Sequence, residues 1–220
     1  MTEPSYQPAE RRPIRTRDLA ASKLAAHWLA VRGVSANAIS TAGMLAAIGG
    51  GAALAATSLD APWTRLLWLA GAAGAQLRLL ANMLDGMVAI ESGRASPVGE
   101  LFNEAPDRVS DAAMFIGLGY AAGGNPELGY LAALAAVFTA YVRAMAKVAG
   151  APQDFGGPMA KPQRMLAVTV VSLYNAAAPS AWQPSWGPTS IALTVIAAGG
   201  LLTALLRLRR AAAYLRQAGR

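Results

Sequence analysis

The sequence predicts an all-α integral membrane protein with six transmembrane helices preceded by a juxtamembrane amphipathic helix. Of its 220 residues, 55% are hydrophobic and only 14% are charged, whereas about 25% charged is ordinary for a soluble domain. Six apolar segments, each close to the roughly 20 residues that a helix needs to cross a bilayer, nearly use up the chain. One membrane domain is therefore the simplest organisation.

The N-terminal part predicts two segments that lie outside the membrane core. Residues 1–14 are polar and contain proline, which predicts a mobile cytoplasmic head. Residues 15–33 mix apolar side chains such as Leu24 and Trp28 with basic ones such as Arg32. This mixture favours an amphipathic helix that lies in the headgroup region.

A six-helix domain is predicted over residues 34–207, followed by a basic cytoplasmic tail at residues 208–220. The breaks between its apolar segments are rich in glycine and proline, which end helices. The segments run over about 36–57, 65–91, 99–122, 128–149, 165–180 and 188–206.

The placement of lysine and arginine predicts the orientation. These residues gather before the first span, after the last one, and in the second and fourth loops. The positive-inside rule then places both termini and the even-numbered loops in the cytoplasm, with the protein in the cytoplasmic membrane. The net charge of +7 is explained by this topology and by contact with anionic lipid, so no nucleic-acid partner is expected.

The chain contains no cysteine and a single histidine, His27. Disulfide scaffolds, thiolate metal sites and cysteine nucleophiles are therefore excluded, and one histidine cannot build a zinc cluster alone.

Polar residues interrupt the second and third spans at helical spacing. Asn82 and Asp85 lie three residues apart near the cytoplasmic end of the second span. The third span then carries a glycine or a polar residue at every fourth position: Gly99, Asn103, Asp107 and Asp111. An acid or amide in hydrocarbon is costly unless it is paired, hydrated or bound to a cation. The two stripes are expected to face each other across a tight hairpin.

This constellation predicts a metal site with oxygen ligands. Carboxylate and amide oxygens suit Mg²⁺, Mn²⁺ or Ca²⁺ and disfavour zinc. Side chains one helical turn apart can reach metal ions about 3.5–4 Å apart, the separation typical of two-metal phosphoryl chemistry. Structural hydrogen bonds between two helices would explain one or two such residues, but they explain poorly five asparagines and aspartates at helical spacing on adjoining helices.

The same stretch resembles the CDP-alcohol phosphotransferase family, six-helix enzymes with the motif D-x2-D-G-x2-A-R-x8-G-x3-D-x3-D. Asp85-Gly86, Ala89, Gly99 and Asp107 fall on motif positions with unbroken spacing. Three positions depart from the motif: asparagine replaces its first and third aspartates at Asn82 and Asn103, and Ile90 replaces its arginine. The chain therefore looks like an aspartate-to-asparagine branch of the family.

The resemblance implies a phosphoryl displacement in which an alcohol attacks a CDP-linked alcohol and releases CMP. The implied donor is CDP-diacylglycerol or another CDP-alcohol, the acceptor is a small alcohol, and the cofactor is Mg²⁺ or Mn²⁺. The family also implies a possible homodimer.

The resemblance also implies roles for residues of this chain. Its metal shell comprises Asn82, Asp85, Asn103 and Asp107. Asp107 is the implied base, and Asp111, one turn later, is the other candidate for that role. The nucleotide would lie against Gly86, Ala89 and Gly99.

Several further residues have two interpretations each. Asn37 resembles the family's segment at the mouth of the first span, where it would approach the nucleotide or cap the helix. Arg78 would contact a phosphate or pair with Asp85. Four basic residues at the cytoplasmic ends of the fourth and fifth spans would seat an anionic acceptor or lipid phosphate, or would serve only as membrane anchors. These four are Arg143, Lys147, Lys161 and Arg164.

The sequence thus predicts a phospholipid-biosynthetic transferase, with two alternatives left open. One is a non-catalytic relative that binds CDP-lipid or nucleotide, since half of the motif carboxylates are amides. The other is a cation transporter, which would also contain intramembrane acids.

Overall fold

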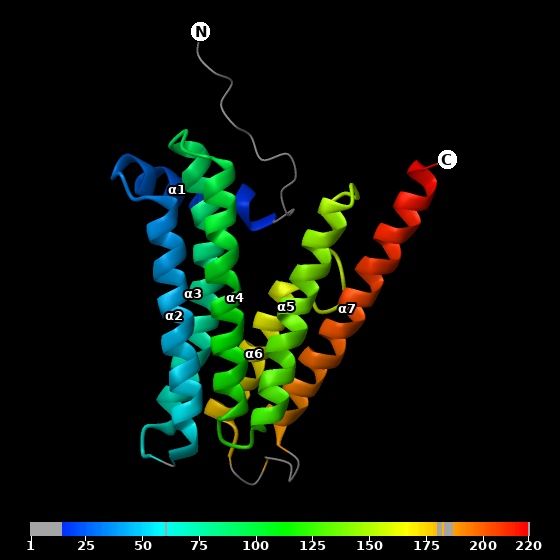
Figure 1. Cartoon of the computed structure of the whole chain (residues 1–220). Coiled ribbons are helices and arrows are strands. Elements are labelled where there is room, and N and C mark those ends of the chain that lie inside the picture. Colours follow the sequence, from blue (N-terminus) through cyan, green and yellow to red (C-terminus); the bar gives the residue numbers. More distant parts are fainter. Residues whose placement is uncertain (1–14, 60, 180–181, 183–186, 220) are drawn as a thin grey trace.

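The computed structural model describes residues 15–59, 61–179, 182 and 187–219. The predicted mobile head at residues 1–14 lies outside the described residues. Within them the chain is all-α, with one short helix followed by six long ones (Figure 1). The α-helices are α1 (Ala20–Val31), α2 (Ala36–Ala56), α3 (Thr64–Glu91), α4 (Pro97–Gly119), α5 (Pro126–Val148), α6 (Lys161–Ala177) and α7 (Pro188–Ala218).

The predicted helix ranges are confirmed to within a few residues for the first four spans, because glycine and proline mark their ends. Two ranges differ more. α6 begins at Lys161, four residues earlier than expected, since a proline is well tolerated in the first helical turn. α7 continues to Ala218, so most of the predicted basic tail is helical.

Helix α1 lies at the end of the bundle where α3 ends and α4 begins (Figure 1). Ala26 is its one buried residue. His27 Nδ1 lies 2.9 Å from Glu91 Oε1 and ties α1 to the end of α3. The guanidinium of Arg32 lies over the Trp28 ring at 3.8 Å, a cation–π contact.

Glycines allow α2, α3 and α4 to pack backbone against backbone. A Cβ atom on Gly117 would lie only 2.2 Å from the carbonyl oxygen of Gly51, and one on Gly74 would lie 2.8 Å from Cα of Gly50. Small residues at helix interfaces are typical of membrane bundles. Gly50 and Gly51 thus serve helix packing, whereas a Cβ atom on Gly49 would meet nothing within 4 Å.

Three helical segments among the described residues are long and apolar enough to cross a membrane: Ala36–Leu59, Pro126–Val148 and Pro188–Ala218. The mean hydropathy over an 18-residue window is 1.6, 1.5 and 2.0, respectively. The first includes the short 3₁₀ helix η2 (Thr57–Leu59) that continues α2. The remaining long helices, α3, α4 and α6, carry the charged residues described below, and α6 has only 17 residues. Large apolar side chains such as Leu45, Leu66 and Leu134 are exposed on the outside of the bundle, as on a lipid-facing surface.

Candidate active site

The turn between α3 and α4 places the two polar stripes side by side. Gly93 adopts φ +65° after the last turn of α3, and the N–H of Arg94 donates to the carbonyl oxygen of Ala89 at 2.9 Å. This αL glycine ends the helix with little strain. Ser96 then caps α4 by accepting a hydrogen bond from the N–H of Gly99 at 3.1 Å.

Asp85 and Asn103 meet at the hydroxyl of Ser40 in α2. Ser40 Oγ lies 2.5 Å from Asp85 Oδ2 and 2.7 Å from Asn103 Oδ1. The other carboxylate oxygen of Asp85 accepts a hydrogen bond from the N–H of Gly86 at 2.6 Å. Asp85 is 2% exposed. The structure therefore brings the α3 and α4 stripes together, and Ser40 is a third member that the sequence reasoning missed.

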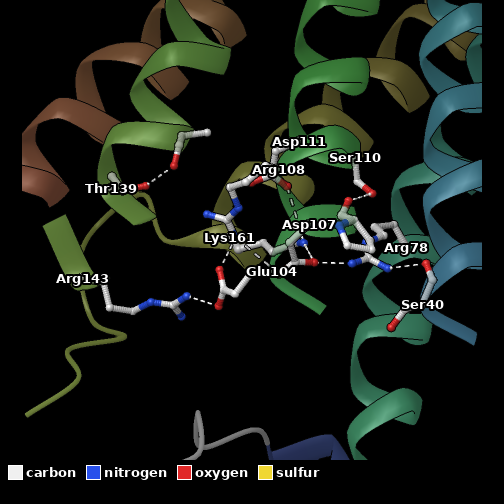
Figure 2. A network of polar contacts seen from close by, with 12 residues as sticks. Ser40, Arg78, Glu104, Asp107, Arg108, Ser110, Asp111, Thr139, Arg143 and Lys161 are labelled. Atoms are coloured by element: carbon white, nitrogen blue, oxygen red, sulfur yellow. Dashed lines mark hydrogen bonds and ion pairs between the residues drawn. The ribbon is translucent and has the colours of Figure 1, made fainter. Parts of the chain in front are cut away.

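Asp107 forms ion pairs with two cations on neighbouring helices. Its Oδ1 atom accepts hydrogen bonds from Arg78 of α3 and Lys161 of α6 (Figure 2). Arg78 is fully buried, and it also donates to the carbonyl oxygen of Ser40 at 3.2 Å. The expected alternative in which Arg78 pairs with Asp85 is wrong, because two helical turns separate these residues along α3 whereas Asp107 faces Arg78 from α4.

Asp111 lies one turn further along α4 and is also paired. Its Oδ2 atom accepts a hydrogen bond from Arg164 at 2.9 Å, and Lys161 Nζ lies 3.6 Å from its Oδ1 atom. Arg164 also donates to the hydroxyl of Thr139 in α5 at 2.9 Å. Asp111 is 1% exposed, whereas the side chain of Asp107 is 14% exposed. Only Asp107 of the two is open to a ligand.

A pocket beside Asp107 is lined mainly by cations. Its lining comprises Asp107, Arg108, Thr139, Ala140, Arg143, Phe155, Ala160, Lys161, Arg164 and Arg207. Arg143 forms an ion pair with Glu104, and its guanidinium lies 5.1 Å from the centre of the Phe155 ring. Three of the four predicted basic residues, Arg143, Lys161 and Arg164, therefore line one pocket.

Two further cations of this pocket were missed. Arg108 lies next to Asp107 in the motif, and Arg207 donates to the carbonyl oxygens of Gly156 at 2.9 Å and Thr139 at 3.1 Å. The available signal for Arg207 was its position at the end of the last apolar segment, which we interpreted only as topology. Arg207 is 7% exposed, so it is not a headgroup anchor.

Other predicted site residues lie apart from these contacts. Lys147 is exposed near the end of α5 and is not among the residues that line the pocket. Asn37 is exposed in the first turn of α2, and its predicted capping role is wrong because Ser35 caps this helix by accepting from the N–H of Ala38 at 3.1 Å. Asn82 is half-buried one turn before Asp85, and Ala89 is half-buried one turn after it.

The ligand set suits a divalent ion at Asp85 but not at Asp107. Within the described parts of the chain, no group of three or more His, Cys, Asp or Glu residues could hold a metal ion. Asp85 is nevertheless a buried carboxylate without an ion pair to any described cation, and the amide of Asn103 reaches the same hydroxyl. Asp107, in contrast, already has three cationic partners, Arg78, Lys161 and Arg108.

Comparison with known proteins gives distant relatives, among them two synthases of inositol phosphate lipids. No family model matches the chain. The phosphatidylinositol phosphate synthase of Mycobacteroides abscessus is 29% identical over 154 residues, which cover 67% of this chain and 66% of that protein. The archaetidylinositol phosphate synthase of Aeropyrum pernix is 32% identical over 127 residues, covering 56% and 62%. The inner membrane protein YnbA of Escherichia coli is 28% identical over 90 residues, covering 41% and 45%.

The chain thus spans about half to two thirds of the length of these curated relatives. Among solved structures, the Mycobacterium tuberculosis phosphatidylinositol phosphate synthase with CDP-DAG bound superimposes with a TM-score of 0.69 at 22% identity, over 88% of this chain and 94% of that one. The chain has the fold of this synthase. The same synthase in complex with manganese and citrate gives a TM-score of 0.68 at 22% identity, over 86% and 88%. The chain is therefore an all-α membrane protein distantly related to phosphatidylinositol phosphate synthases.

Proposed function

We propose that the chain belongs to the CDP-alcohol phosphotransferase family and transfers a phosphatidyl group from CDP-diacylglycerol to an alcohol, releasing CMP. The observation that carries this proposal is the α3–α4 hairpin, which presents Asp85, Gly86, Gly99 and Asp107 at the family's spacing beside a pocket of cations. The distant relatives support the same reaction class. The predicted location is the cytoplasmic membrane, with both termini in the cytoplasm.

The donor nucleotide is proposed to bind at the hairpin. A Cβ atom on Gly99 would meet only Ser96 Oγ, at 3.3 Å, so the small residue leaves room beside the start of α4. Gly86, Ala89 and the exposed Asn37 are the other proposed contacts. Asp85, with the amides of Asn82 and Asn103, would hold a divalent ion, Mg²⁺ or Mn²⁺, which would neutralise pyrophosphate charge.

The acceptor alcohol is proposed to enter the pocket beside Asp107. Arg143, Lys161 and Arg164 supply positive charge there, together with Arg108 and Arg207. Such a lining favours an acceptor that carries a phosphate or another anionic group, because guanidinium groups bind phosphate in a bidentate manner.

Asp107 is proposed to be the general base. Its Oδ1 atom is engaged by Arg78 and Lys161, whereas its Oδ2 atom has only Arg108 as a described neighbour, at 3.5 Å. The acceptor's hydroxyl proton would therefore pass to Oδ2. Asp111 is buried beneath it, and its proposed role is to hold Lys161 and Arg164 in place.

The test is CMP release by the purified protein in mixed micelles with CDP-diacylglycerol, Mn²⁺ or Mg²⁺, and a panel of glycerol phosphate, inositol phosphate, serine and simple polyols. We expect acceptor-dependent release that Asp107→Asn abolishes. Full activity in excess chelator would contradict the metal requirement. Failure to bind CDP-diacylglycerol and to release CMP with any acceptor would overturn the proposal.

One observation favours a second candidate, a non-catalytic protein that binds CDP-lipid. Two of the four motif carboxylates are amides, and a third, Asp107, is already neutralised by Arg78 and Lys161. Binding of CDP-diacylglycerol without CMP release for any acceptor would favour this candidate over the transferase.

A further inference from the structure

We propose that Arg78 and Lys161 take the place of a divalent ion at Asp107, so that the site holds metal only at Asp85. This inference rests on the proposed function, since it concerns the metal that the transferase would use. It makes Arg78 and Lys161 positioning residues that act through Asp107.

Charge balance is the first argument. The motif brings only two carboxylates, Asp85 and Asp107, because positions 82 and 103 are asparagines. Around Asp107 and Asp111 the structure places four cations, Arg78, Arg108, Lys161 and Arg164, each within ion-pair distance of at least one of these two acids. A divalent ion at Asp107 would add two positive charges where the acids are already balanced, and it would repel the neighbouring cations.

Burial is the second argument. Arg78 is 0% exposed and Lys161 is 6% exposed, so neither side chain extends into solvent. The NH1 atom of Arg78 is held by the carbonyl oxygen of Ser40, which leaves its NH2 atom directed at Asp107. Withdrawing Asp107 to a metal would leave a fully buried guanidinium without its counter-ion, which is strongly unfavourable.

Asp85 provides the contrast within the same site. Among the described residues, the donors to its two oxygens are the neutral groups of Ser40 and Gly86, and no lysine or arginine of this set forms an ion pair with it. Asn82, one turn earlier, makes no side-chain hydrogen bond to the described residues and stays half-buried. A buried carboxylate that lacks a direct ion pair and lies near amide oxygens suits a hard divalent cation.

The asparagines at positions 82 and 103 and the cations Arg78 and Lys161 therefore act together: both lower the number of divalent ions that the site can hold. With aspartate at positions 82 and 103, four carboxylates would need two divalent ions for neutrality. With asparagine there, one divalent ion would face Asp85 alone and keep a net positive charge for the donor's pyrophosphate, while Arg78 and Lys161 hold the Oδ1 atom of Asp107.

The first test is Mn²⁺ binding by the purified full chain in micelles without substrate, followed through the electron paramagnetic resonance signal of free Mn²⁺. We expect one Mn²⁺ per chain. Asp85→Asn should abolish binding, whereas Asp107→Asn should leave the Kd within about threefold. Two ions per chain, no ion at all, or binding that is lost with Asp107→Asn but kept with Asp85→Asn would overturn the inference.

A second test asks whether Lys161 excludes the second ion. The double variant Asn82→Asp, Asn103→Asp should still bind one Mn²⁺, and addition of Lys161→Gln should raise this to two. Equal stoichiometry in the double and triple variants would overturn the role of Lys161. Size-exclusion chromatography and thermal melts of each variant establish that the compared proteins are folded.

The two proposals fail in different ways. One Mn²⁺ held at Asp85 without CMP release would overturn the transferase and leave this inference standing. CMP release together with two Mn²⁺ per wild-type chain would support the transferase and overturn the inference of a single metal.

Discussion

Arg164 donates a hydrogen bond to Asp111 across 2.9 Å, and both side chains are almost completely buried between α4 and α6. Removing one partner of such a pair leaves an uncompensated buried charge, at a cost of about 3–5 kcal/mol. The pair is thus expected to be worth more to the intact bundle than a salt bridge on its surface.

Asp111→Asn should lower the free energy of unfolding by about 3 kcal/mol or more, because Arg164 then lacks its counter-ion. This corresponds to a fall in Tm on the order of 10 °C for a chain of this size. Thermal unfolding in detergent measures it, and the apolar double variant Asp111→Leu, Arg164→Met should recover much of the loss. Equal melting of wild type and single variant would contradict the expectation.

Gly117→Ala should destabilise the bundle by about 1–3 kcal/mol, because the new methyl group would lie 2.2 Å from the backbone carbonyl of Gly51 and the helices would have to separate. Gly49→Ala is the matched control, since a Cβ atom there meets nothing within 4 Å. The two variants are compared by Tm in the same detergent. A Gly117→Ala protein as stable as Gly49→Ala would show that α2 and α4 are not packed as described.

Arg143→Gln should raise the KM for an anionic acceptor about tenfold or more, because Arg143 lines the pocket and a hydrogen bond to a charged group is worth about 1.5–3 kcal/mol. Lys147→Gln, one turn further along α5 on an exposed side chain, should change this KM by less than about twofold. CMP release at varied acceptor concentration measures both. Equal effects would favour general electrostatic attraction over a defined acceptor pocket.

The loop before α6 should loosen in acid through Asp154. Partial burial raises the pKa of Asp154, but hydrogen bonds from Arg210 and from the N–H of Gly156 outweigh it, and the pKa lies below its ordinary value. Since folding lowers this pKa, the stabilisation is present above the unfolded value of about 3.9 and is lost as the pH falls through the folded value. After division by the intrinsic amide exchange rate at each pH, the protection of residues 151–160 should fall in wild type as the pH falls through the folded pKa of Asp154. Asp154→Asn should remove this change in protection.

The orientation can be tested with single cysteines, because the natural chain contains none. Arg94→Cys lies between α3 and α4, and Glu127→Cys lies at the start of α5, and both positions are exposed. On spheroplasts, a membrane-impermeant maleimide should label Glu127→Cys and should label Arg94→Cys only after lysis. The opposite pattern would invert the predicted topology.

The helices and the polar hairpin could be predicted from the sequence because both depend on short-range patterns. Glycine and proline mark most helix ends, and the spacing of Asp85, Asn103 and Asp107 follows from helical periodicity and one tight turn. These patterns also placed Arg143, Lys161 and Arg164 at the correct end of the bundle.

The pairing between helices could not be predicted in the same way. Arg78 has Asp107 as its partner instead of Asp85 because α3 and α4 both pack against α2, and no local spacing encodes that order. Ser40 and Arg207 were missed for the same reason. Each is an ordinary residue in its own helix and gains its role only from a residue at least 45 positions away.

One polar network joins all six long helices. It runs from Ser40 in α2 through Arg78, Asp107, Lys161, Asp111 and Arg164 to Thr139 in α5 and Arg207 in α7. Because each of the six helices contributes a residue, removal of any one helix breaks this network. A shortened fragment could therefore keep its remaining helices and still lose the site. The α3–α4 hairpin alone would therefore lack most partners of Asp107 and Asp111, and a chain split between α5 and α6 would restore this network only when its halves reassemble.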